Sequence, residues 1–280
     1  MKYRNLLFIF LLSVFASCSK DPELEPDTPP STFKVRIDNV IHETYFDSYP
    51  QGPSLFVPYL VMSGLPEGEK LLAFGGYYSP ENPNPDGSDY TFIHDCADDE
   101  LIQGWDWTQE LIYSAGWIDL PIPGKTYYFK GVVRTNKAVY YSNTVTINTD
   151  GLPGYTPGPQ DRVLPVVFHV MPRKDGTYPH PYFFDEMLAC ANRLYRNVWP
   201  LPGLADAGIR FVPATHAPDG TALSTPGIHY LDERYELDLD ISNEELRQWV
   251  GDNLWEMTEV INVWVSPCLL YTSPSPRDCS

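Results

Sequence analysis

Basic residues are scarce in this sequence. Lys and Arg number 19 among 280 residues, against 37 Asp and Glu, which gives a formal net charge of −18. A surface of this sign repels phosphate backbones and anionic lipid headgroups, so we expect no nucleic acid partner. Apolar residues make up 43% of the chain, a share that excludes a wholly disordered or collagen-like protein.

Cysteine is scarce as well, with five copies. Cys18 directly follows the predicted signal peptide, and Cys268 and Cys279 fall in an anomalous C-terminal segment. The other two, Cys96 and Cys190, lie in different predicted domains. We therefore expect two buried free thiols and no disulfide framework.

Proline, by contrast, is abundant. Its 28 copies are about twice the usual share, and they accompany 19 glycines and 19 tyrosines. This composition favours short strands, turns and extended linkers over a helix bundle.

Residues 1–17 have the pattern of a secretory signal peptide, since a cationic start precedes an apolar run and small residues. The string Phe15-Ala16-Ser17-Cys18 resembles a bacterial lipobox, whose cysteine becomes the lipidated first residue. We therefore expect Cys18 to anchor the protein in a bilayer of the bacterial cell envelope, at the outer membrane or cell surface. A plain secretory signal is the alternative. Residues 18–32 are acidic and proline-rich and predict an extended tether.

The C-terminal residues 268–280 do not fit a protein fold. Their CLLYTSPSPRD string resembles a common transposon-derived sequencing adapter translated in one frame. We interpret this segment as a sequencing artefact and exclude it from fold reasoning, the alternative being an ordinary disordered tail. The natural sequence would then stop near Pro267, and we expect the protein to continue beyond it.

Residues 33–150 alternate in the manner of β-strands between turn clusters. The clearest signal is a hairpin, KTYYFKGVVRT followed by AVYYSNTVTINT, joined by Asn136 and Lys137. The segment resembles a fibronectin type III-like sandwich, an immunoglobulin-like fold of about this size. Further strands are expected at 33–37, 54–62 and 70–78.

Residues 151–161 hold a linker rich in proline and glycine, and the pattern changes after it. The run 163–171 predicts a strand buried on both faces, and apolar residues at helical spacing predict a helix over 184–198. Strands are expected at 208–213, 227–232 and 260–265, with a capped helix over 242–257. This order predicts an α/β domain over 162–267.

Several segments of this second domain resemble metzincin-type zinc peptidases of the pappalysin and cytophagalysin group. The segments are VLPVVFHV at 163–170, GIRFVP at 208–213 and INVWV at 261–265, in the same order. With the signal and the sandwich, the chain resembles bacterial zinc-dependent metalloproteinase lipoproteins. The resemblance implies the N-terminal part of an α/β zincin-like domain, truncated here, and a zinc cofactor in the full-length protein.

The catalytic signature of that family, H-E-x-x-H-x-x-G-x-x-H, is missing from the sequence. In the family its histidines bind zinc and its glutamate polarises the attacking water. His42 is followed by Glu43, but Phe46 stands where the second histidine is required, and no other histidine precedes a glutamate. No zinc ligand or catalytic residue can be assigned, and we expect the chain as written to be inactive because the motif lies beyond residue 267.

Other polar and aromatic residues allow two interpretations each. Trp105 and Trp107 could stack on sugar rings, although packing is the ordinary use of such residues. The acidic cluster of Asp95, Asp98, Asp99 and Glu100 could bind calcium, as could the run 232–240, but an exposed loop is the simpler interpretation. His169 fits a hydrogen-bonded position within the sheet.

Two functions follow from these expectations. The first is a membrane-anchored zinc metalloendopeptidase that hydrolyses protein or peptide substrates, with its sandwich as a spacer. The alternative is a non-catalytic surface lipoprotein that binds glycan or protein through the sandwich. An H-E-x-x-H motif in the continuing reading frame would separate them.

Overall fold

The computed structural model describes residues 32–44, 54–173, 176–199, 205–232, 248, 250–252, 254–256 and 259–265. The predicted signal peptide, Cys18, the tether apart from Thr32 and the C-terminal segment lie outside these residues. So does most of the helix expected over 242–257 and, apart from Asp232, the acidic run 232–240.

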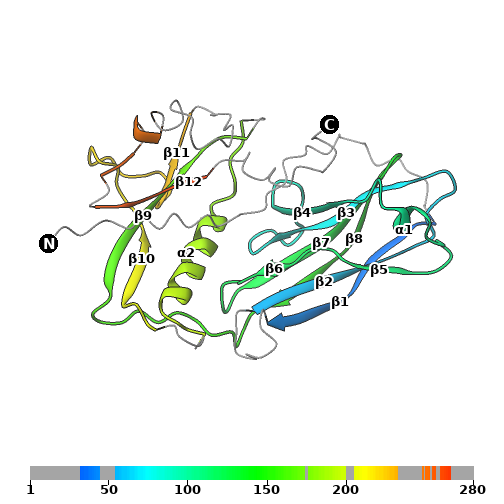
Figure 1. Cartoon of the computed structure of the whole chain (residues 1–280), viewed down its shortest axis with the longest axis horizontal. Helices are drawn as coiled ribbons and strands as arrows, with labels where there is room; N and C mark the ends of the chain where they lie inside the picture. Colours follow the sequence, from blue (N-terminus) through cyan, green and yellow to red (C-terminus); the bar gives the residue numbers. More distant parts are fainter. Residues whose placement is uncertain are drawn as a thin grey trace.

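The first part of the chain is an all-β sandwich of two antiparallel sheets (Figure 1). One sheet has the order β1-β2-β5, and the short β6 also pairs with β2. Its strands are β1 (Lys34–Thr44), β2 (Ser54–Ser63), β5 (Leu111–Ser114) and β6 (Ile118–Asp119). The other sheet has the order β4-β3-β7-β8, with strands β3 (Leu71–Ser79), β4 (Tyr90–Asp95), β7 (Thr126–Thr135) and β8 (Val139–Asn148).

Side chains from both sheets meet in one hydrophobic core. Leu60 and Met62 of β2 and Phe74 and Phe129 of the other sheet are almost fully buried in it. The expected hairpin is confirmed, since β7 pairs with β8 and the amide of Thr135 donates to the carbonyl of Ala138 across the turn. A single turn of helix, α1 (Glu100–Gln103), and the strands β4, β5 and β6 were not expected from the sequence.

The second part contains a sheet in which every described pair is parallel. β9 (Arg162–Val170) lies at its centre, with β10 (Ile209–Pro213) and β11 (Ile228–Tyr230) pairing along it and β12 (Ile261–Val265) also paired to it. The helix α2 (Tyr182–Tyr195) connects β9 to β10 and stands between this sheet and the sandwich (Figure 1). The expected strands and the first helix are therefore present, with small shifts at their ends.

The C-terminal part of β9, residues 166–170, is buried on both faces, as its apolar pattern predicts, whereas Val163 near its start is 51% exposed. Val166, Phe168 and Val170 pack with Phe184 of α2 on one face. Val167 lies on the other face with Trp255, because successive side chains of a strand point to opposite sides. The sheet thus has a helix-covered face and a second face, on which His169 lies.

Candidate functional site

The residues proposed from sequence as a stacking pair are used differently in the structure. Trp105 is 37% exposed. Trp107 instead packs against the sandwich core and meets the ring of Phe33 edge-on at 5.9 Å between centroids. Trp107 thus has a packing role, and Trp105 is the ring of the pair that is exposed.

Two carboxylates of the acidic cluster around α1 accept hydrogen bonds from nearby main-chain amides. Asp99 caps α1, where its Oδ1 accepts from the amides of Leu101 (3.0 Å) and Ile102 (3.2 Å). Asp95 accepts from the amide of Ala97 (3.0 Å). Within the described residues there is no group of three or more His, Cys, Asp and Glu that could hold a metal ion.

Cys96 and Cys190 are both buried free thiols, as expected. Burial raises the pKa of Cys96 to about 12 and that of Cys190 to about 11. Neither sulfur is therefore a nucleophile at neutral pH.

None of the helices in the described residues is both long and apolar enough to cross a bilayer.

A hydrogen-bonded pair of histidines lies on the face of the parallel sheet opposite α2. His169 is fully buried, and its Nδ1 lies 2.9 Å from Nδ1 of His229 on β11. Its Nε2 lies 2.8 Å from Oδ1 of Asn262 on β12. The rings of Trp264 and Trp255 contact His169 at 4.8 and 5.5 Å between centroids. His169 therefore joins three neighbouring strands and has no nitrogen left for a ligand.

The surroundings of Asn262 determine which nitrogens carry protons. The Asn262 Nδ2 donates to the carbonyl of Trp255 (3.1 Å), and its Oδ1 accepts from the amide of Trp255 (3.0 Å). Because this oxygen can only accept, Nε2 of His169 must donate to it. A neutral His169 then accepts at Nδ1, so His229 donates from its own Nδ1.

The electrostatics agree with a neutral pair. Burial lowers the pKa of His169 to about 4, the neighbouring His229 acts in the same direction, and the bond to Asn262 opposes them. Burial also lowers the pKa of His229, an effect that Asp232 opposes. Both rings are therefore uncharged at neutral pH, and the hydrogen bonds that occupy both nitrogens of His169 give the pair a structural role.

α2 contacts the sandwich through a second side of the helix. The hydroxyl of Tyr182 donates to the carbonyl of Tyr78 (3.2 Å) and accepts from the amide of Tyr90 (3.0 Å), at the end of the β3–β4 ladder. The ring of Phe183 contacts Tyr90. We call the surface formed by Tyr182, Phe183, Glu186 and Arg193 the α2–sandwich contact.

Arg193 is 2% exposed and bonds to main-chain carbonyls of the sandwich. Its guanidinium donates to the carbonyl of Pro121 (2.8 Å) and to that of Leu120, which has a positive φ of 46°. The ring of Trp199 stacks on the same guanidinium at 4.9 Å. A buried cation thus holds the loop before β7 in place.

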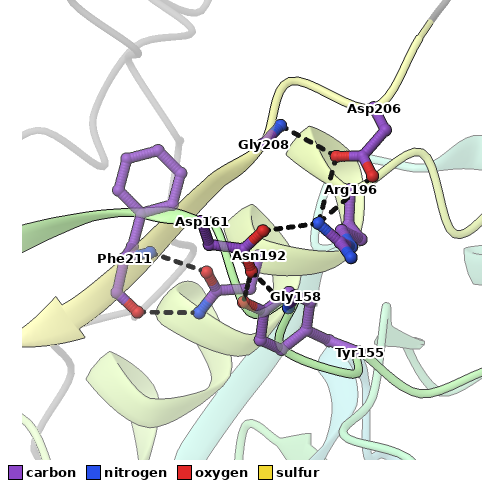
Figure 2. Close-up of polar contacts among 8 residues, drawn as sticks. All are labelled: Tyr155, Gly158, Asp161, Asn192, Arg196, Asp206, Gly208 and Phe211. Atoms are coloured by element: carbon purple, nitrogen blue, oxygen red, sulfur yellow. Dashed lines mark hydrogen bonds and ion pairs between the residues drawn. The ribbon is translucent and has the colours of Figure 1, made fainter.

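Polar contacts also tie the segment before β9 to the end of α2 (Figure 2). Asp161 accepts from the amide of Gly158 (2.6 Å), the hydroxyl of Tyr155 (3.0 Å) and Nη1 of Arg196 (2.6 Å). These contacts, with the Gly158 amide as the largest, hold the pKa of Asp161 below its ordinary value. Arg196 also pairs with Asp206 at 3.1 Å. The proline- and glycine-rich linker is therefore anchored at its C-terminal end.

Asn192 of α2 bonds to the main chain of β10 (Figure 2). Its Nδ2 donates to the carbonyl of Phe211 (2.9 Å), and its Oδ1 accepts from the amide of Phe211 (2.7 Å). The amide side chain thus occupies both main-chain groups of one residue, as a neighbouring strand would. This fixes the helix against the sheet that its apolar side covers.

Comparison of the chain with known proteins does not identify its function. No protein family and no curated protein matches the chain. A solved structure that does match is that of a DUF3823 family protein from Bacteroides ovatus, with 15% identity and a TM-score of 0.28. The match covers 42% of this chain and 55% of that protein, about half of its length. A likeness at this level supports no functional assignment.

Sequence reasoning found His169 but missed its partners and the α2–sandwich contact. His229 and Asn262 lie 60 and 93 residues away from His169 along the chain, and no local pattern marks them. A signal for the helix contact was present, because Tyr182, Glu186 and Arg193 recur at i, i+4 and i+11 on one side of a helix.

Proposed function

We propose that this chain is the N-terminal part of a lipid-anchored bacterial zinc endopeptidase with a fibronectin-like sandwich. The observation that favours it is the order of β9, α2, β10 and β12, with parallel pairing to a central strand whose C-terminal part is buried on both faces. The three segments that resemble the zinc peptidase group coincide with β9, β10 and β12. The zincin-like assignment is a proposal, because it rests on that resemblance.

The described residues do not themselves fit a zinc ion. Both nitrogens of His169 are engaged, Nδ1 of His229 is engaged with it, and no third ligand accompanies them in the part of the chain that the structure describes. We therefore assign no step of hydrolysis to these residues. Their proposed role is to form the scaffold on which a catalytic site from the continuing chain would be built.

The sandwich would act as a rigid spacer between that scaffold and the membrane. Arg193 and Tyr182 both bond to its main chain, and the linker is anchored at Asp161. Contacts of this kind fix the orientation of the sheet relative to the sandwich. A tether over residues 18–32 with a lipid on Cys18 would complete the proposed arrangement.

The reading frame of an intact gene provides the first test. We expect an H-E-x-x-H motif within about 60 residues after Pro267, as the resemblance to the zinc peptidase group implies. The protein encoded by that gene should then contain zinc and cleave a protein substrate, and replacing the glutamate of the motif by glutamine should abolish cleavage but retain zinc. A continuing frame without the motif would overturn the enzyme proposal.

Binding of glycan or protein by the sandwich is the second candidate, and the exposed rings favour it. Trp105 and Trp117 are each 37% exposed and Tyr113 is 40% exposed. Large aromatic rings at a surface can stack on sugars. Binding on a glycan array that is lost in the Trp105→Ala protein would support this function, whereas no binding by the unmodified chain would count against it.

A further inference from the structure

Glu186 has an unusual position in the α2–sandwich contact. Its Oε1 is closed off from solvent, and no donor among the described residues bonds to it. Its carboxyl is within hydrogen-bonding reach of the Tyr127 hydroxyl on β7, and that hydroxyl already accepts from the amide of Ile122 (2.9 Å). A carboxylate in this position would bury a negative charge with one oxygen unsatisfied, which is costly.

The charged groups around Glu186 form no ion pair with it in the described part of the chain. On α2 these are Asp185 and Arg193, and from the sandwich side Lys125. The guanidinium of Arg193 bonds to carbonyls of Leu120 and Pro121, and Lys125 is exposed. The remaining titratable groups that face Glu186 are the hydroxyls of Tyr78, Tyr127 and Tyr182 and the thiol of Cys190.

These contacts favour a neutral Glu186 in the closed contact. A protonated carboxyl can be buried beside the tyrosines without an ion pair, whereas the ionised form requires water or a cation. We propose that Glu186 makes the α2–sandwich contact pH-dependent: the protonated acid closes the contact, and its ionisation loosens α2 from the sandwich. This does not depend on the peptidase proposal.

The expected size of the effect follows from proton linkage. Burial raises the pKa of Glu186 from 4.5 to about 7 in the closed contact, while Tyr127 and Arg193 act against it. The equilibrium constant for opening of α2 should therefore rise about tenfold per pH unit across this interval and then level off, a total of roughly 300-fold.

Hydrogen exchange of the full chain tests this proposal. We expect the protection of α2 amides, corrected for the intrinsic pH dependence of exchange, to fall with pH as calculated above. In the Glu186→Gln protein, whose side chain is neutral at every pH, protection should stay constant. The control is Glu67→Gln, which removes an exposed carboxylate between β2 and β3 and should leave the wild-type dependence unchanged.

A second measurement needs no substitution and applies even if the variant fails to fold. In the wild-type chain labelled with ¹³C-glutamate, the carboxyl resonance of Glu186 should titrate with a midpoint near 7. The proposal is overturned if no glutamate carboxyl titrates there, or if α2 protection has the same pH dependence in the wild-type and Glu186→Gln proteins.

Discussion

Replacing His169 by glutamine should change how the stability of this protein depends on pH. The pKa of His169 is lowered from 6.5 to about 4 in the folded protein, chiefly by burial. The unfolded chain therefore binds more protons between these values, and stability rises with pH across them. A shift of this size corresponds to about 3 kcal/mol, fully present above pH 6.5 and lost as the pH falls towards 4.

Glu186 has the opposite effect over nearly the same interval. Because burial raises its pKa from 4.5 to about 7, the folded protein binds more protons there, and stability falls as the pH rises. The magnitude is again about 3 kcal/mol, as an upper limit. Between pH 4.5 and 6.5 the contributions of His169 and Glu186 should therefore nearly cancel.

Urea unfolding at constant ionic strength, at intervals between pH 4.5 and 6.5, measures this balance. Relative to wild type, the His169→Gln protein should lose about 1 kcal/mol of stability per pH unit as the pH rises, and the Glu186→Gln protein should gain about as much. Differences from wild type are compared because carboxylates such as Asp161, whose pKa is lowered, contribute to every curve. The double variant should resemble wild type in slope.

An exposed histidine provides the control for this experiment. His216 lies in a loop, where its ring contacts the hydroxyl of Thr215, and the His216→Gln protein should follow the wild-type curve. If His169→Gln changes stability by the same amount at every pH, then His169 is not held neutral by burial. The interpretation of the histidine pair as a structural, uncharged cluster would then be refuted.

Three further substitutions separate packing from surface roles. Arg193→Met should lower the free energy of unfolding, measured in urea, by about 3 kcal/mol, because two carbonyls of the sandwich lose their hydrogen-bond donor. A loss below about 1 kcal/mol would contradict a stabilising role for these buried hydrogen bonds. Trp107→Ala should cost about 3 kcal/mol and Trp105→Ala less than about 0.5 kcal/mol in thermal unfolding, and equal costs would contradict the assigned positions. Asn192→Ala should lower the free energy of unfolding by about 2 kcal/mol and speed hydrogen exchange at the Phe211 amide, and unchanged protection of that amide would contradict the contact.

Much of the fold could be predicted because its strongest signals are local. The β7–β8 hairpin has alternating residues around a short turn, and β9 has a continuous apolar run. β6 has two residues and α1 four, so neither can show a period. These elements depend on contacts with distant strands, such as the pairing of Phe56 with Ile118, that a local pattern does not contain.

The candidate site could be predicted in part for the same reason. The expectation that His169 is hydrogen-bonded within the sheet is correct, because a polar residue inside a buried strand needs partners. The identity of those partners depends on which strands lie beside β9. Parallel strands are joined through long connections, so the neighbours of His169 come from segments far along the chain.

The helix α2 shows why polar residues complicate the prediction of burial. Its apolar positions predict the side that packs on the parallel sheet, and Phe184 lies there. The opposite side includes the buried Arg193 and the half-buried Glu186, whose Oε1 is shielded from solvent, and a hydrophobic pattern assigns both residues to solvent. Such residues are buried only where a partner surface supplies carbonyls and hydroxyls, as the sandwich does through Pro121 and Tyr127. The change of sequence pattern at residues 151–161 therefore separates the β-sandwich from the part of the chain that contains α2. Side chains of α2 nevertheless form hydrogen bonds to the main chain of the sandwich across this boundary.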